Sequence, residues 1–128
     1  MNGEIEGLSR KSARAFARDC ASIIAVCEDE HELHHGLLVL EGLIDGTSID
    51  SEREQAHAAL GCTPYYLGAR AVQCALHENP HIAAKLALKE VIALTKWLDG
   101  IPCSGPRVRR AHHIERSVRD RLSGYAAP

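Results

Sequence analysis

The sequence predicts an all-α protein, a compact single-domain bundle of about six helices over residues 1–128. Three observations support this prediction. A capping residue precedes proline at Thr63-Pro64, Asn79-Pro80 and Gly105-Pro106, which is typical of helix starts because a first-turn amide has no intrahelical partner. Hydrophobic residues make up 45% of the chain but aromatic residues only 4%, which suits close-packed helices of Ala, Leu, Ile and Val. Runs typical of β-strands are almost absent.

Length, charge and the N-terminal sequence bound the class of protein. At 128 residues and 13.9 kDa, the chain can bury roughly two-thirds of its unfolded surface around one core. A net charge of -2 provides no general attraction to nucleic acid or membranes. No apolar stretch approaches the length of a membrane span or resembles a signal peptide. We therefore expect a cytoplasmic protein that does not engage a membrane.

The five cysteines indicate a reducing compartment. Their number is odd, no two have Cys-x-x-Cys spacing, and Cys20 and Cys27 lie too far apart along one predicted helix to form a disulfide. We expect small buried apolar side chains rather than a disulfide framework, with Cys103 as the most exposed thiol.

The first predicted helix runs from about Ile5 to Cys27, after a frayed end at residues 1–4. Its apolar residues form one stripe and its basic residues lie largely off that stripe, which is typical of an amphipathic surface helix. The stripe consists of Ile5, Leu8, Phe16, Cys20, Ile23, Ile24 and Cys27, and the basic residues are Arg10, Lys11, Arg14 and Arg18.

The second predicted helix starts after Asp29, whose spacing to Glu32 fits a capping box, and ends at Asp45-Gly46. Its second half is apolar nearly all round, so we expect that half to be buried. The main stripe is Leu33, Leu37, Leu40 and Ile44, and the other apolar residues are Leu38, Val39 and Leu43.

The third and fourth predicted helices are shorter. The third begins with Ser51 as N-cap, closed by Glu54, and runs to Leu60 before Gly61. The fourth extends over residues 64–77 and has so narrow a polar line that little of it can be exposed. That polar line is Tyr66, Arg70, Gln73 and His77.

The fifth predicted helix, Pro80 to Leu98, is the core helix and ends at Gly100. The sixth, Pro106 to Leu122, is amphipathic with a basic face, and residues 124–128 should be frayed. On the fifth helix we expect only the line of Lys85, Lys89 and Lys96 to be exposed to solvent. The sixth buries Val108, Ala111, Ile114, Val118 and Leu122 and turns Arg109, His113, Arg116 and Arg119 outward.

Histidine follows glutamate by three residues four times, a spacing that di-iron helical bundles use. Two of the pairs straddle predicted helix starts and in a third the glutamate is a cap, which leaves Glu32 and His35. His31 and His35 fall nearly opposite the leucine stripe, so they face solvent or a partner. We expect no cofactor, and a surface transition-metal site of His31, Glu32 and His35 is the alternative. The pairs are Glu28/His31, Glu32/His35, Glu54/His57 and Glu78/His81.

The segment 54–70 resembles a helix-turn-helix of the arabinose-activator type. Gly61 stands in the turn, Thr63 caps the second helix and Leu67 takes its inward position, whereas His57 replaces the small residue of that pattern. The resemblance implies a second helix in the major groove. It would bring Tyr65, Tyr66, Arg70 and Gln73 near bases or phosphates.

Glu90 is the most anomalous residue, because it projects between apolar side chains of the fifth helix. An unpaired carboxylate there is costly. Either Glu90 has a partner such as Arg70 or a histidine, or that face opens onto a groove or a second subunit. A structural ion pair and a buried acid in a pocket are both open at this point.

The charges divide along the chain. The charged residues between positions 28 and 54 are all acidic apart from Arg53. The last predicted helix, in contrast, is rich in arginine. That basic face could be solvated, bind an acidic protein, or pair with the acidic helices within the chain or across a homodimer. We prefer the third of these, charge pairing within the chain or across a homodimer.

These patterns favour a small non-enzymatic interaction or regulatory protein that self-associates, because no nucleophile or phosphate-loop signature occurs. Nearly all-round apolar helices in so short a chain are the reason to expect association, most simply as a dimer. The first alternative is nucleic-acid binding through residues 51–77 and the last helix, and the second is the metal site. The residues expected to contact a partner or nucleic acid are Tyr66, Arg70, Gln73, Arg109, Arg116 and Arg119.

Overall fold

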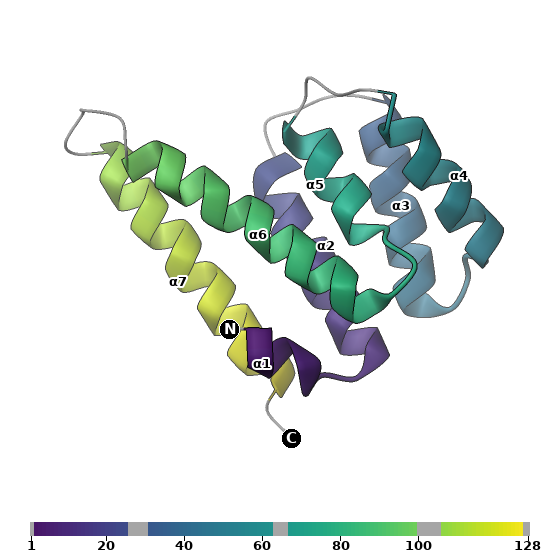
Figure 1. Ribbon diagram of the computed structural model, residues 1–128, viewed down its shortest axis with the longest axis horizontal. Helices are drawn as coiled ribbons and strands as arrows, with labels where there is room; N and C mark the ends of the chain where they lie inside the picture. The colour runs from purple at the N-terminus through teal and green to yellow at the C-terminus, as the bar shows by residue number, and fades with distance from the viewer. Residues whose placement is uncertain (1, 26–30, 63–66, 100–105, 127–128) are drawn as a thin grey trace.

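The computed structural model describes residues 2–25, 31–62, 67–99 and 106–126, with side chains at 3–25, 31–62, 67–96 and 113–125. It confirms the all-α prediction, because seven α-helices and no strand occur in these ranges (Figure 1). The helices are α1 (Asn2–Glu6), α2 (Arg10–Ala25), α3 (His31–Asp45), α4 (Asp50–Leu60), α5 (Leu67–Ala75), α6 (Pro80–Asp99) and α7 (Pro106–Ala126).

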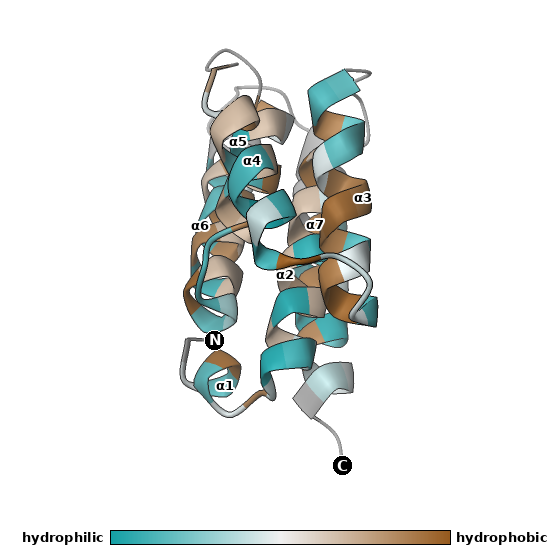
Figure 2. Cartoon of the chain, turned by 90° about the vertical axis from the view of Figure 1, so that its right-hand side faces the viewer, coloured by the Kyte–Doolittle hydropathy of each residue, from teal (hydrophilic) through white to brown (hydrophobic). Residues whose placement is uncertain are grey.

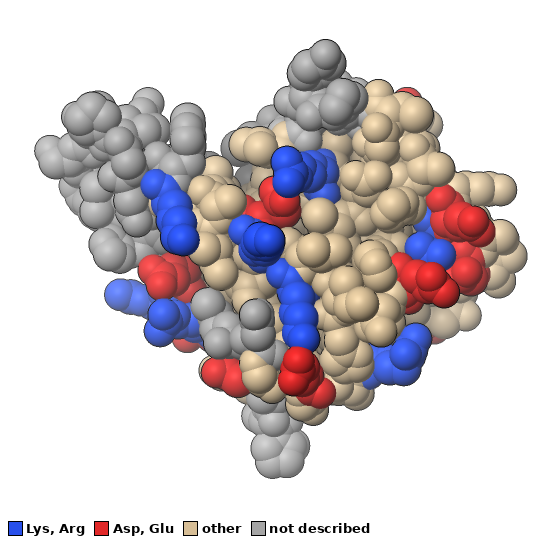
Figure 3. Space-filling model, in the orientation of Figure 1, with Lys and Arg blue, Asp and Glu red and all other residues tan. Residues whose placement is uncertain are grey.

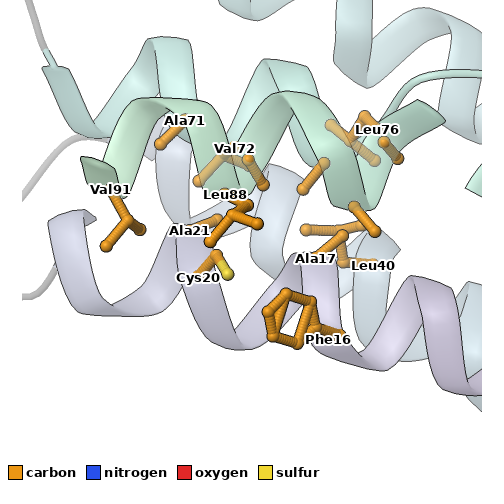
Figure 4. Packing of buried hydrophobic residues seen from close by; sticks show 14 of the residues in the cluster. Phe16, Ala17, Cys20, Ala21, Leu40, Ala71, Val72, Leu76, Leu88 and Val91 are labelled. Carbon is orange, nitrogen blue, oxygen red and sulfur yellow. The ribbon is translucent and has the colours of Figure 1, made fainter. Parts of the chain in front are cut away.

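Helix α2 lies at the centre and contacts α3, α5, α6 and α7. The prediction of an ordinary surface helix is therefore wrong for most of α2, because its small side chains let the other helices approach closely and leave only Arg10, Lys11 and Ser22 of this helix exposed. Figure 4 shows side chains of α5 and α6 packed onto Phe16 and Cys20 of α2. The buried alanines of α2 are Ala13, Ala15, Ala17, Ala21 and Ala25.

The predicted first helix is two helices. Helix α1 ends at Glu6, and α2 begins at Arg10. Between them Ser9 acts as an N-cap, because its Oγ accepts a hydrogen bond from the Ser12 amide at 3.1 Å. The turn brings Ile5, which is fully buried, onto the same core as α2 and adds a helix where a frayed end was predicted.

The start of α6 confirms the Asn79-Pro80 signal. Asn79 Oδ1 accepts hydrogen bonds from the amides of His81 at 2.9 Å and Ile82 at 3.3 Å. Helix α7 likewise begins at Pro106. Pro64 lies outside the described residues, so its role at the start of the fourth helix stays a prediction.

The predicted cap of α4 is wrong by two residues. The N-cap is Ile49, and its amide donates to Glu52 Oε1 at 3.1 Å. The glutamate of the capping box is therefore Glu52 and not Glu54. Ser51 lies inside the helix rather than before it. The neighbouring Asp50 accepts a hydrogen bond from Arg53 Nε at 2.7 Å, which stabilises the first turn.

The second half of α3 is buried on one side only. Val39 and Leu40 are buried, but Leu38 is 70% exposed, so the prediction for that residue is wrong. The reason is that α2, α4 and α5 cover one side of α3 and leave the other open. Hydrophobic stretches along α3 are seen in brown in Figure 2.

The end of α7 packs where a frayed tail was predicted. The ring of Tyr125 meets Phe16 edge-to-face, with centroids 6.4 Å apart, and its hydroxyl donates to Asp19 Oδ2 at 2.5 Å. Asp19 is 7% exposed and also accepts a hydrogen bond from Arg18 Nε at 3.1 Å.

Within the described residues, no helix combines the length and the apolar character that crossing a bilayer requires.

Candidate functional site

Glu90, the residue that the sequence marks as anomalous, is paired. Its Oε1 lies 3.0 Å from Arg70 Nε, so an ion pair joins α5 to α6. The Glu90 side chain is only 16% exposed, whereas that of Arg70 is 67% exposed. Arg70 is the partner that the sequence analysis named first. The pair satisfies the half-buried carboxylate and leaves the rest of the arginine in solvent.

The same face also opens onto a pocket of about 380 Å³ between α2, α5 and α6. This volume lies near the lower end of the range for small-molecule pockets. Glu90 is the single charged residue of its lining. The ion pair and the acid in a pocket, which the sequence analysis treated as alternatives, therefore occur together. The lining residues are Ile24, Leu67, Glu90, Ala93 and Leu94.

The charges of Glu90 and Arg70 also affect the pKa of the Cys74 thiol on α5. Burial, and then the Glu90 carboxylate, raise the pKa of the Cys74 thiol, while Arg70 opposes them. A thiol with a raised pKa stays protonated at neutral pH and is a poor nucleophile. The Cys74 thiol is therefore a poor candidate for nucleophilic chemistry.

Two exposed lysines of α6 lie near Ala93 along the helix, although neither lines the pocket. Lys89 and Lys96 are exposed and share one stripe of α6 with Ala93, at spacings of four and three residues. Figure 3 shows Lys and Arg side chains over α5 and α6 and a group of acidic side chains over α4. Acidic side chains also stand beside the basic ones over α6 and α7 in this view, so the separation of charge between helices is partial (Figure 3).

Helix α5 does not present the surface that the helix-turn-helix resemblance implies. Leu67 is 57% exposed instead of facing inward. Gln73 Nε2 donates to the His57 carbonyl at 3.3 Å, and Arg70 is held by Glu90, so both are used within the chain. Because α2 and α6 both pack on α5, little of it is free to enter a major groove. Tyr65 and Tyr66 lie outside the described residues.

The basic face of α7 points away from the acidic helices. Helix α7 contacts α1, α2 and α6, while α3 and α4 lie on the other side of the molecule (Figure 1). Arg119 Nη2 lies 3.2 Å from Glu115 Oε1 of its own helix, and Arg116 and His113 are exposed. The Arg109 side chain lies outside the described ones. The described basic side chains of α7 therefore do not pair with the acidic side chains of α3 and α4 within one chain in this fold.

The candidate metal residues do not converge. His31 and His35 are exposed on α3 and Glu32 is half-buried. In the ranges that the structure covers, no group of three or more His, Cys, Asp and Glu side chains could hold an ion. Glu78 precedes the first residue of α6, as expected, so Glu78 and His81 do not share a helix.

Two buried arginines, missed by the sequence analysis, meet at the C-terminal end of α5. Arg14 donates to the carbonyls of Ala75 at 2.9 Å, His77 at 2.5 Å and Glu78 at 3.2 Å. Arg53 Nη1 donates to the Leu76 carbonyl at 2.9 Å. The alanines around Arg14 were the available signal, because neighbouring helices can surround such a stretch.

Comparisons of the chain with protein-family models, curated proteins and solved structures found no match. The function is therefore argued from the geometry of the pocket and the arrangement of charge.

Proposed function

We propose that this chain is a small interaction protein that self-associates. The observation that supports this most directly is that an acidic and a basic surface each expose a leucine. On α3 and α4, residues 31–60 contain six acidic residues and one arginine, and Leu38 is 70% exposed. On the other surface, Leu67 is 57% exposed three residues before Arg70, and Lys89 and Lys96 are exposed on α6.

The two surfaces suit each other physically. Full burial of a leucine stabilises an association by about 1.5–3 kcal/mol before the entropic cost of binding. Opposite charges around an apolar contact raise the association rate and select the orientation of the partner. Because one chain has both surfaces, a second copy can supply the complementary surface.

Sedimentation velocity over a wide concentration range tests this function. The expected mass rises with concentration from 13.9 kDa toward twice that value. Higher salt should weaken association, because the pairing charges are exposed and screened. A strict monomer at high concentration and low salt would remove the proposal.

Nucleic-acid binding through α7 is the second candidate, since α5 offers little surface. His113, Arg116 and Arg121 surround one shallow pocket of α7, where a phosphate could meet several donors. Asp120 lines the same pocket and opposes an anion. Titration with labelled DNA and RNA tests this candidate, and its affinity should fall steeply with salt. Absence of binding at low salt would dismiss it.

A further inference from the structure

We infer that the pocket between α2, α5 and α6 receives Leu38 of a second copy of this chain. The inference rests on the proposed self-association and specifies the two surfaces that meet. It is a helix-in-groove contact, in which an exposed apolar side chain of one helix enters a groove between others.

The receiving pocket is lined by apolar side chains and Glu90, and two exposed lysines lie outside it on α6. Leu67 and Leu94 supply apolar surface, and Ala93 leaves the space open because its side chain is small. Lys89 and Lys96 lie on either side of Ala93 along α6, and both are exposed. Because Arg70 is already paired with Glu90, these lysines are the charges available to an incoming acidic surface.

The entering surface is apolar at Leu38, acidic on the C-terminal side of that residue along α3, and lined by the exposed His31, His34 and His35 on its N-terminal side. Leu38 is the most exposed of the large hydrophobic residues in the described ranges. Glu41 and Asp45 follow it by three and seven residues, so all three share one stripe of α3. Both oxygens of Glu41 lie 3.1 Å from Arg18 Nη1, so this carboxylate, like Arg70, is already paired within the chain, and Asp45 supplies the acidic charge of the stripe.

Charge complementarity favours a second copy over other occupants. The stripe of Leu38 presents the carboxylate of Asp45 on its C-terminal side, and the α6 surface next to Ala93 presents the ammonium groups of Lys89 and Lys96. Two copies related by a two-fold axis can make this contact twice, because each has one Leu38 and one pocket. Ile49, which is 62% exposed, is the other acid-flanked apolar residue and gives a matched comparison.

Two variants test the contact by complementation. Leu38→Asp removes the entering side chain and keeps the pocket, whereas Ala93→Arg fills the pocket and keeps Leu38. Each variant alone should self-associate at least tenfold more weakly than the wild type, as removal of an interface hot spot does. An equimolar mixture should form a 1:1 complex in sedimentation velocity, because one copy supplies Leu38 and the other the pocket.

The controls separate this contact from self-association itself. Circular dichroism must show native helix content for both variants, and Ile49→Asp should associate like the wild type. If the wild type associates but Leu38→Asp and Ala93→Arg associate equally well, or their mixture forms no complex, the contact is overturned and the proposed function remains. If Ile49→Asp alone prevents association, Ile49 enters instead and the inference is wrong. A monomeric wild type would contradict both the Leu38 contact and the proposed self-association.

Discussion

The two ends of helix α5 are built in opposite ways. At its C-terminal end, Arg14 and Arg53 are buried and donate to four successive carbonyls of residues 75–78. At its N-terminal end, Leu67 is exposed beside the pocket. We call these the closed end and the open end. The closed end fixes the helix in the fold, and the open end leaves apolar surface for a partner.

The chemistry of the closed end follows from helix termini in general. The last carbonyls of a helix lack intrahelical partners and form the negative end of its dipole, so a buried cation suits that position. Burial, and then the nearby Arg53 charge, lower the pKa of Arg14 to about 10, which still leaves its guanidinium charged at neutral pH. A hydrogen bond from Arg53 to Asp50 raises the pKa of Arg53.

The largest expected effect is at the closed end. Arg14→Met should lower the free energy of unfolding by about 2–4 kcal/mol, because three carbonyls lose a charged donor in a buried place. Replacing the whole ion pair of the open end, Arg70→Met together with Glu90→Gln, should cost less than about 1 kcal/mol, since the arginine is exposed and no unpaired carboxylate remains. Urea unfolding of both variants measures the difference. Equal losses would contradict the distinction between the two ends.

Packing against the middle of α5 gives the next effect. A Cβ at Gly36 of α3 would lie 2.9 Å from Val72 Cγ1 and 3.0 Å from Leu60 Cδ1. Gly36→Ala should therefore lower the free energy of unfolding by about 1–3 kcal/mol through overpacking.

Gly124→Ala is the matched control for Gly36→Ala, because nothing lies within 4 Å of a Cβ at Gly124. Alanine there should raise the free energy of unfolding by up to about 1 kcal/mol through its helix propensity. A neutral Gly36→Ala in the same urea titrations would show that α3 and α5 can separate without cost.

A smaller effect is expected from pH near the closed end. Burial, then the charges of Arg53 and His77, lower the pKa of His57 below its ordinary value of 6.5. The unfolded chain therefore binds a proton that the folded chain resists, and the free energy of unfolding should fall as pH drops below about 6.5. His57→Gln should flatten this dependence between about pH 5 and 7. An unchanged slope in urea titrations across that range would show that His57 does not contribute.

The smallest effect concerns the ion pair of the open end. A double-mutant cycle with Arg70→Met and Glu90→Gln should give a coupling energy of at most about 1 kcal/mol, because the arginine is largely in solvent. A coupling energy of several kcal/mol would mean that this pair, like Arg14, belongs to the fold.

The sequence predicted what local signals determine. The helix start at Asn79-Pro80 and the need of Glu90 for a partner followed from capping chemistry and from the cost of an unpaired carboxylate. Arg14 was not predictable in this way, because its acceptors are backbone carbonyls more than 60 residues away that exist only at the end of a folded helix. Tyr125 was missed for a similar reason, since its partners Phe16 and Asp19 are on α2. Leu38 was assigned to the core because helical periodicity does not reveal which side of α3 the neighbouring helices cover.

Side-chain methyl shifts in NMR spectra, recorded while the protein concentration is raised, test the account most directly. The methyl groups of Leu67 and Leu94 at the open end, and of Leu38 on α3, should shift with a common concentration dependence. The methyl groups of Ala75 and Leu76 at the closed end should not move. If the spectra are independent of concentration, or if the shifts gather at the closed end, the open end of α5 is not the surface at which this protein associates.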